Sequence, residues 1–161
     1  MKSPVDMNMR LSENFTLGEM CRSDKAERHQ PKPIPNIPLK RHVTALQNLC
    51  QRVLQPARDH FKFPFQITSG YRCPLVNHLV GGVDTSQHCL GEAADFIIPR
   101  KHWPWGYESQ EQILRTVFNY MRDCVDYDQL ILEHRGSSWW IHVSCRIDLR
   151  KNRHQAIRSE K

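Results

Sequence analysis

A carboxylate inside an apolar strand is the feature that most constrains how this chain of 161 residues can fold. Residues 93–98 pass from two alanines to phenylalanine and isoleucine, a pattern typical of a short buried strand, and Asp95 lies within it. A buried carboxylate is costly unless it meets a cation or several hydrogen-bond donors. The fold must therefore bring such a partner to Asp95, and a metal ion would be one.

Two histidines are candidates for binding the same metal. His88 precedes Asp95 by seven residues, which suits two ligands on a turn and the strand that follows it. Residues 140–144 alternate in polarity, so His142 and Trp140 are predicted to share one face of a second strand. Two histidines and one carboxylate leave zinc an open fourth position for water, as in hydrolytic sites. A lone strand histidine is more often a core or surface residue, so the spacing alone leaves that alternative open.

Three motifs occur in a fixed order along the chain. They are Ser-Gly-Tyr-Arg at 69–72, Ser86-x-His88-x-x-Gly91-x-Ala93-x-Asp95, and Trp140-x-His142. In this order they resemble the M15 family of zinc D-Ala-D-Ala peptidases, and a set of three is more specific than any one motif. The chain is most similar to the branch of small bacterial and phage cell-wall peptidases, which shares its core with hedgehog signalling domains. The resemblance runs from about residue 15 to residue 144.

The resemblance implies both an activity and a site. The chain would be a zinc metallopeptidase that hydrolyses peptidoglycan stem peptides, as a D-Ala-D-Ala carboxypeptidase or a related endopeptidase, with His88, Asp95 and His142 as zinc ligands. Arg72 would face the metal and bind the carbonyl oxygen or carboxylate of the substrate rather than the metal, a task that suits its planar fork of five donors. The alternative for Arg72 is an ordinary surface arginine. Ser86 is predicted to hydrogen-bond near the site or to substrate, and Trp140 to line the pocket.

The general base is the residue for which the motifs give the least guidance. Several relatives carry an acid three residues before the last histidine, where this chain has Trp139. We expect Glu133 to replace it, because Glu133 lies near the end of a predicted strand at 128–134 that a turn at 136–138 folds back against the strand of His142. Glu92 is the second candidate. The alternative for Glu133 is an exposed acid at the end of a strand.

The pattern predicts an α+β fold, with a small antiparallel sheet that bears the zinc site and helices packed on one side of it. Helices are expected after a cap at Thr16, over 18 to 22 residues from Pro38, and at 74–80 and 109–124. Strands are expected at 65–68, 93–98, 128–134 and 139–145. We expect a flexible lead-in at 1–13, a peptidase-like domain at 14–146 and a solvated basic tail at 147–161.

The composition of the chain indicates which kinds of partner and which location to expect. The net charge of +6 favours an anionic partner, either nucleic acid or bacterial wall polymer. No basic run with interleaved aromatic residues occurs outside the tail, so charge alone does not choose between the two. A nucleic-acid-binding protein remains a further alternative that rests only on the net charge, and nucleic acid is the less expected partner. No apolar run approaches the ~20 residues of a membrane span. The six cysteines are scattered singly and no secretory leader precedes them, so we expect free thiols in a chain made in the cytoplasm, which reaches the cell wall through lysis or other machinery. A monomer is expected.

A different class of function remains open. The missing acid before His142 favours a binding module that keeps the metal but has lost turnover, as signalling relatives of this fold show is possible. Hydrolysis and binding therefore stand as the two hypotheses for the site.

Overall fold

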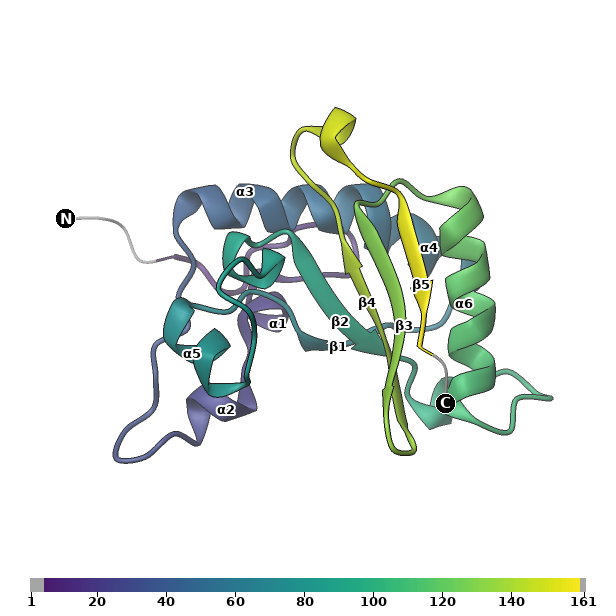
Figure 1. The fold of residues 1–161 in the computed structure, drawn as a ribbon, viewed down its shortest axis with the longest axis horizontal. Coiled ribbons are helices and arrows are strands. Elements are labelled where there is room, and N and C mark those ends of the chain that lie inside the picture. The colour runs from purple at the N-terminus through teal and green to yellow at the C-terminus, as the bar shows by residue number, and fades with distance from the viewer. Residues whose placement is uncertain (1–4, 160–161) are drawn as a thin grey trace.

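A computed structural model describes residues 5–159, and its sheet confirms the α+β prediction. The five strands lie in the order β1-β2-β4-β3-β5, and all neighbours are antiparallel except β3 and β5 (Figure 1). The strands are β1 (Gln66–Ser69), β2 (Ala93–Ile97), β3 (Gln129–Arg135), β4 (Ser138–Ser144) and β5 (Gln155–Arg158). The four strands expected from sequence are therefore present.

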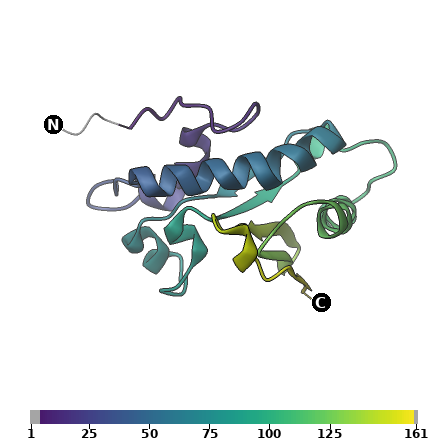
Figure 2. The same ribbon diagram turned by 90° about the horizontal axis from the view of Figure 1, so that it is seen from above.

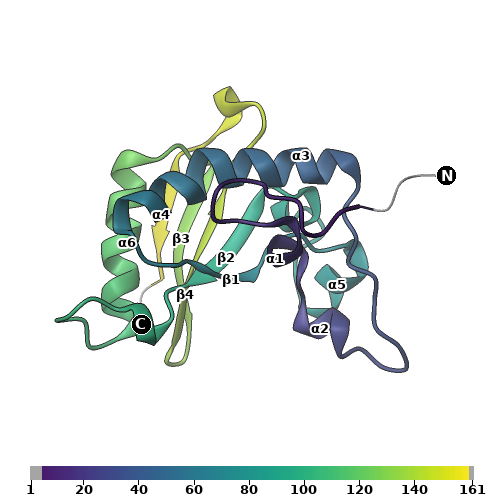
Figure 3. The same ribbon diagram turned by 180° about the vertical axis from the view of Figure 1, so that it is seen from behind.

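The core lies between one face of the sheet and the helices. The helices are α1 (Leu17–Cys21), α2 (Asp24–Glu27), α3 (Lys40–Leu49), α4 (Gln55–Phe61), α5 (Pro74–Leu79) and α6 (Gln110–Cys124). In β4, Ile141 and Val143 are fully buried, whereas Trp140 and His142 are only partly buried. Helices α3 and α4 run along one side of the sheet (Figures 2 and 3), and α6 packs on β3 and β4. The opposite face of the sheet is thus available for polar side chains.

The long helix predicted from Pro38 is continuous over residues 40–61 but is not regular. Its middle turn, Cys50–Leu54, is π-helical, and the amide of Gln55 bonds to the carbonyl of Cys50. Pro56 follows at the start of α4. Because proline has no amide hydrogen and its ring collides with the carbonyl four residues earlier, a wider turn before Pro56 relieves the clash. The apolar periodicity predicted the helix and not this turn.

The flexible lead-in predicted at 1–13 is corrected for the part that the structure describes, while residues 1–4 lie outside the described residues. Leu11 is 1% exposed and its amide donates to the carbonyl of Phe15 at 2.9 Å. The amide of Gly18 donates to the carbonyl of Met7 at 2.7 Å. The segment therefore packs on α1, because burying Leu11 in the core holds it there.

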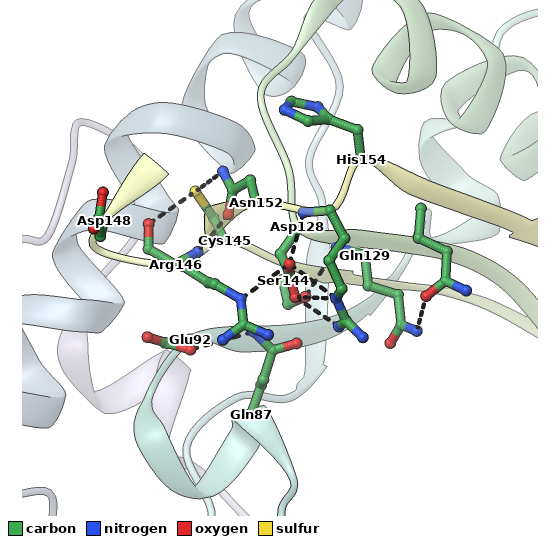
Figure 4. Close-up of polar contacts among 12 residues, drawn as sticks. Gln87, Glu92, Asp128, Gln129, Ser144, Cys145, Arg146, Asp148, Asn152 and His154 are labelled. Carbon is green, nitrogen blue, oxygen red and sulfur yellow. Dashed lines mark hydrogen bonds and ion pairs between the residues drawn. The ribbon is translucent and has the colours of Figure 1, made fainter. Parts of the chain in front are cut away.

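The tail predicted to be solvated contains β5, although every residue of that strand is exposed. The strand is anchored by Asp128, which is 0% exposed and accepts hydrogen bonds from Arg146 and Arg153. The amide of Gln155 donates to the carbonyl of Asp128 at 3.0 Å. Figure 4 shows Asp128 beside Arg146 and Ser144 at this junction. A buried acid that needs cationic partners thus orders part of the basic segment.

Two further findings concern the described part of the chain. No helix within residues 5–159 is long and apolar enough to cross a membrane. The six cysteines are free thiols.

Candidate metal centre

His88, Asp95 and His142 meet on the face of the sheet opposite α3 and α4, where the end of α5 borders the site. His88 lies in a 3-10 turn, Gln87–Leu90, while Asp95 and His142 stand directly opposite each other in β2 and β4. Asp95 Oδ1 lies 3.4 Å from His88 Nε2 and 2.8 Å from His142 Nδ1. One ligand atom from each residue lies within 4.8 Å of the other two. The structure therefore brings together the three residues that the sequence proposed as metal ligands.

The donor set fits a zinc ion. Tetrahedral zinc with bonds of ~2.0 to 2.1 Å places neighbouring ligand atoms ~3.3 Å apart, close to the 3.4 Å between Asp95 Oδ1 and His88 Nε2, while Asp95 Oδ1 and His142 Nδ1 are closer, at 2.8 Å. His88 Nδ1 lies 2.7 Å from the carbonyl oxygen of Gly70, so Nδ1 carries the proton and Nε2 keeps its lone pair for a metal. Two nitrogens and one carboxylate oxygen leave a fourth position free of protein ligands, as hydrolytic sites do.

The electrostatics of the cluster also suit a cation. Burial lowers the pKa of His88, which favours the neutral imidazole that metals bind. Burial alone raises the pKa of Asp95, but the interactions of its carboxylate with His88 and His142 outweigh this effect. The pKa of Asp95 therefore lies well below its usual range, and the carboxylate is ionised.

Two glycines allow the segments of the site to approach each other. A Cβ on Gly70 would lie 2.1 Å from the carbonyl oxygen of Met20, so a side chain there would push β1 away from α1. Gly91 ends the turn of His88 with φ of 75°, and a Cβ there would lie 2.6 Å from the carbonyl oxygen of His42. Both glycines of the motifs thus serve close packing.

Ser86 supports the turn of His88. Its hydroxyl accepts a hydrogen bond from the amide of His88 at 3.3 Å and caps the 3-10 turn. Ser86 is not among the residues that line the cavity over the ligands. The structure therefore gives Ser86 a place near the site, and contact with substrate stays a prediction.

Arg72 lies beside the cluster and holds one of its members. Its guanidinium donates to Asp95 Oδ2 at 3.2 Å, to Ser69 Oγ at 2.8 Å and to Asn77 Oδ1 at 3.3 Å. Asn77 is itself fixed, because its amide donates to the carbonyl of Val83. Three of the five N–H groups of Arg72 are engaged, which leaves two for another acceptor. Arg72 thus orients the ligand carboxylate, a contact that the sequence reasoning did not foresee.

Two asparagines that the sequence reasoning passed over support Arg72. Asn77 binds Arg72 directly, and Asn36 binds the chain on both sides of Arg72. Asn36 Nδ2 donates to the carbonyls of Cys21 and Tyr71, and its Oδ1 accepts from the amide of Cys73, all at 2.8 Å. No pattern in the sequence marks Asn36, because its partners lie 15 to 37 residues away.

A cavity of about 330 Å³ opens over the three ligands. Glu133 lines it from β3, where it stands opposite Trp140 of β4, two residues from His142. Burial raises the pKa of Glu133, as it does for carboxylates that act as general acids or bases. Trp140 and Arg135 also line the cavity. Sequence reasoning named Trp140 and missed Arg135, although period-two alternation from Glu133 marks it.

Glu92, the second candidate for the general base, does not line the cavity, and neither do His134 and Trp139 of the hairpin. Glu92 accepts a hydrogen bond from Gln87 at 3.2 Å and does not line the cavity (Figure 4). Trp139, at the position of the missing acid, is 5% exposed on the core side and stacks on His134. Alternation along β3 and β4 thus separates Glu133 from His134.

Comparison with known proteins agrees with this site. The family model for peptidase M15 matches residues 13–144, most of the chain and all three proposed ligands. No curated protein matches the sequence. Because the match extends from α1 to β4 and covers most of the chain, the chain belongs to the peptidase M15 family.

Proposed function

We propose that this protein is a zinc-dependent peptidase that hydrolyses peptide bonds in peptidoglycan stem peptides, as a D-Ala-D-Ala carboxypeptidase or a related endopeptidase. The observation that carries the proposal is one cavity that joins the cluster of His88, Asp95 and His142 to Glu133. Membership of a peptidase family supplies the class of reaction. The cavity volume of about 330 Å³ lies within the range of sites for small ligands.

The residues that line the cavity would have different roles in hydrolysis. His88, Asp95 and His142 would hold zinc, which would supply Lewis-acid polarisation of the scissile carbonyl. Glu133 accepts a proton from the water that attacks the carbonyl carbon, and it returns the proton to the leaving amine when the C–N bond breaks. The raised pKa of Glu133 suits both steps, because it brings the carboxylate closer to the working pH.

Arg72 and Trp140 position the substrate. The two free N–H groups of Arg72 would bind the carbonyl oxygen as negative charge develops on it, while the other three keep Asp95 in place. Trp140 offers a flat apolar wall beside Glu133. Ser86 acts from behind the site, by fixing the turn that carries His88.

A metal-containing binding module is the second candidate. The observation that favours it is Trp139, because a buried aromatic residue takes the place of the acid that several relatives carry there. In that case Glu133 would line the cavity without acting as a base. The ligand cluster serves either function, so turnover must decide.

The deciding experiment is incubation of the purified, zinc-loaded protein with a set of muropeptides, with the products identified by mass spectrometry. Loss of one alanine identifies a carboxypeptidase, and release of a longer fragment identifies an endopeptidase. Muropeptides that bind but stay intact would support the binding module, and the absence of both binding and cleavage would exclude both functions.

The metal site itself is tested by replacing one ligand. His142→Ala should reduce bound zinc from one equivalent to a small fraction at neutral pH, because two ligands hold zinc far less tightly than three. The measurement is zinc content by atomic emission after dialysis. His78→Ala is the matched control, since His78 is exposed on α5 and does not line the cavity. Retention of one zinc in His142→Ala would contradict the site.

A further inference from the structure

The cavity contains two arginines with different surroundings. Arg72 is 13% exposed in its side chain and is tied to Asp95, Ser69 and Asn77. Arg135 is exposed at the end of β3, and no residue within 5–159 forms an ion pair or hydrogen bond with its guanidinium. Arg135 is therefore the cation of the cavity that has its full set of donors to offer a ligand.

The position of Arg135 follows from the register of the hairpin. Glu133 stands opposite Trp140, and Arg135 stands opposite Ser138, at the end of the hairpin away from His142. Side chains two residues apart share a face and lie ~6.6 to 6.8 Å apart along a strand. The face of the sheet opposite α3 and α4 thus carries, in order, the ligand cluster, then Glu133 and Trp140, then Arg135.

A peptide laid along this face meets the three groups in turn. If the peptide runs with its leaving-group side toward Arg135 and its scissile carbonyl lies at the ligand cluster, the leaving amine lies toward Glu133, and the next group along the chain lies one residue further, ~3.3 to 3.6 Å on. The long side chain of Arg135 can reach back over that distance. Its planar fork of donors matches the two oxygens of a carboxylate.

We propose that Arg135 binds a carboxylate on the leaving-group residue of the substrate. Arg72 then binds the oxygen of the scissile carbonyl, so the two arginines contact different groups of the substrate. This inference rests on the proposed peptidase function and refines it to peptides that bear a carboxylate directly after the cleaved bond. The carboxylate belongs either to a free C-terminus or to an acidic side chain. Because both present the same two oxygens to Arg135, the experiment below includes one substrate of each kind.

The experiment compares three peptides with one acyl part. The first is an acetylated tripeptide that ends in D-Ala-D-Ala with a free carboxylate, the second is its C-terminal amide, and the third is an amide whose last residue is D-Asp. Arg135→Ala should lower kcat/KM for the peptides whose carboxylate reaches Arg135 by about tenfold or more, and leave the neutral amide unchanged. Arg135→Lys should restore part of the loss, because it keeps the charge without the fork.

A binding measurement separates this inference from the proposed function. In Glu133→Gln protein, titration calorimetry should show tighter binding of the free acid, or of the D-Asp peptide, than of the neutral amide, and Arg135→Ala should abolish that difference. Arg28→Ala is the matched control, since Arg28 is exposed and lies outside the cavity. Whichever of the two acidic peptides depends on Arg135 identifies the source of the carboxylate.

The outcomes are distinct. If the wild type cleaves the peptides and Arg135→Ala lowers kcat/KM equally for the acid and the amide, or not at all, the role of Arg135 is refuted. The proposed peptidase function would then still stand. Binding that prefers a carboxylate through Arg135, without cleavage by the wild type, would support the carboxylate site and refute turnover.

Discussion

Arg72 has a contact with a proposed metal ligand in addition to its proposed role on the substrate. Sequence resemblance predicted a role on the substrate, and the structure adds a hydrogen bond to Asp95 Oδ2 at 3.2 Å. Such a contact fixes the direction of the ligand carboxylate, and loss of an outer partner of this kind typically costs 10 to 100-fold in metal affinity or activity. The proposed substrate role of Arg72 would therefore be coupled to the geometry of the metal site.

Arg72→Lys is expected to impair both functions of the side chain. A lysine keeps one charge but cannot bond Asp95, Ser69 and Asn77 together, so we expect kcat to fall by about tenfold or more and zinc affinity to fall by up to about tenfold. Steady-state kinetics and competition with a zinc chelator measure the two effects. Arg28→Lys, on the exposed surface, is the control. Unchanged kinetics would refute the role of Arg72 on the substrate. Unchanged zinc affinity would refute its role in orienting Asp95.

The β3–β4 hairpin is the element that carries Glu133, the proposed general base. Its register sets Glu133 opposite Trp140 and sets Ile131 opposite His142, so Glu133 lies diagonal to a ligand on the same face. Glu92, which is closer to the other ligands in sequence, bonds to Gln87 outside the cavity. Strand pairing therefore outweighs proximity along the chain in choosing between the two acids.

Glu133→Gln should lower turnover by roughly 10²-fold or more while zinc stays bound, because the amide keeps the size of the side chain but cannot accept the proton. Glu92→Gln should change kcat little. Both variants are compared by kcat for a cleaved muropeptide and by zinc content. In the wild type, kcat/KM should fall as the pH drops through the pKa of Glu133, which burial raises, and this acid limb should be absent from the residual activity of Glu133→Gln. An inactive Glu92→Gln beside a fully active Glu133→Gln would reverse the assignment.

At the scale of the whole molecule, Asp128 ties the end of the chain to the sheet. It is fully buried and bonds Arg146 from the end of β4 and Arg153 from the segment before β5. Burial alone raises the pKa of Asp128, but the hydrogen bonds from Arg153 and then from Arg146 hold it well below its usual range. The carboxylate thus stabilises the folded state in its ionised form.

Asp128→Asn is expected to lower the free energy of unfolding by about 2 kcal/mol at pH 7, because the amide loses its charge-assisted hydrogen bonds. The folded pKa lies below the unfolded value of ~3.9, so this stabilisation is present above about pH 4 and is lost as the pH falls toward the folded pKa. The free energy of unfolding is measured with urea for wild type and variant from pH 7 to pH 3. The difference between the two free energies should become smaller below pH 4.

Asp123→Asn is the control for this prediction, since Asp123 is exposed and pairs with the adjacent Arg122 on the surface. It should leave the midpoint of unfolding nearly unchanged. A difference between Asp128→Asn and wild type that stays constant down to pH 3 would show that the charge of Asp128 contributes nothing to stability.

Local patterns in the sequence predicted four of the five strands and the longer helices, and together with the order of the three motifs they indicated the three candidate ligands. Alternation in residues 140–144 predicted that His142 and Trp140 face away from the core, and apolar spacing predicted the long helix, because side-chain direction depends mainly on local backbone geometry. The motif order allowed the family to be recognised before the fold was known. Pro56 was a local clue to the π-helical turn that the periodicity did not capture.

Only the tertiary structure decided which side chains meet across distant segments. The contact of Arg72 with Asp95, the support from Asn36 and the burial of Asp128 under the tail all join segments separated by 15 to 37 residues. Such contacts depend on strand register and on the packing of whole elements, which no short window of sequence determines. The register of the hairpin places both Glu133 and Arg135 at the cavity, and the guanidinium of Arg135 has no partner within residues 5–159. These two side chains give the site its proposed chemistry.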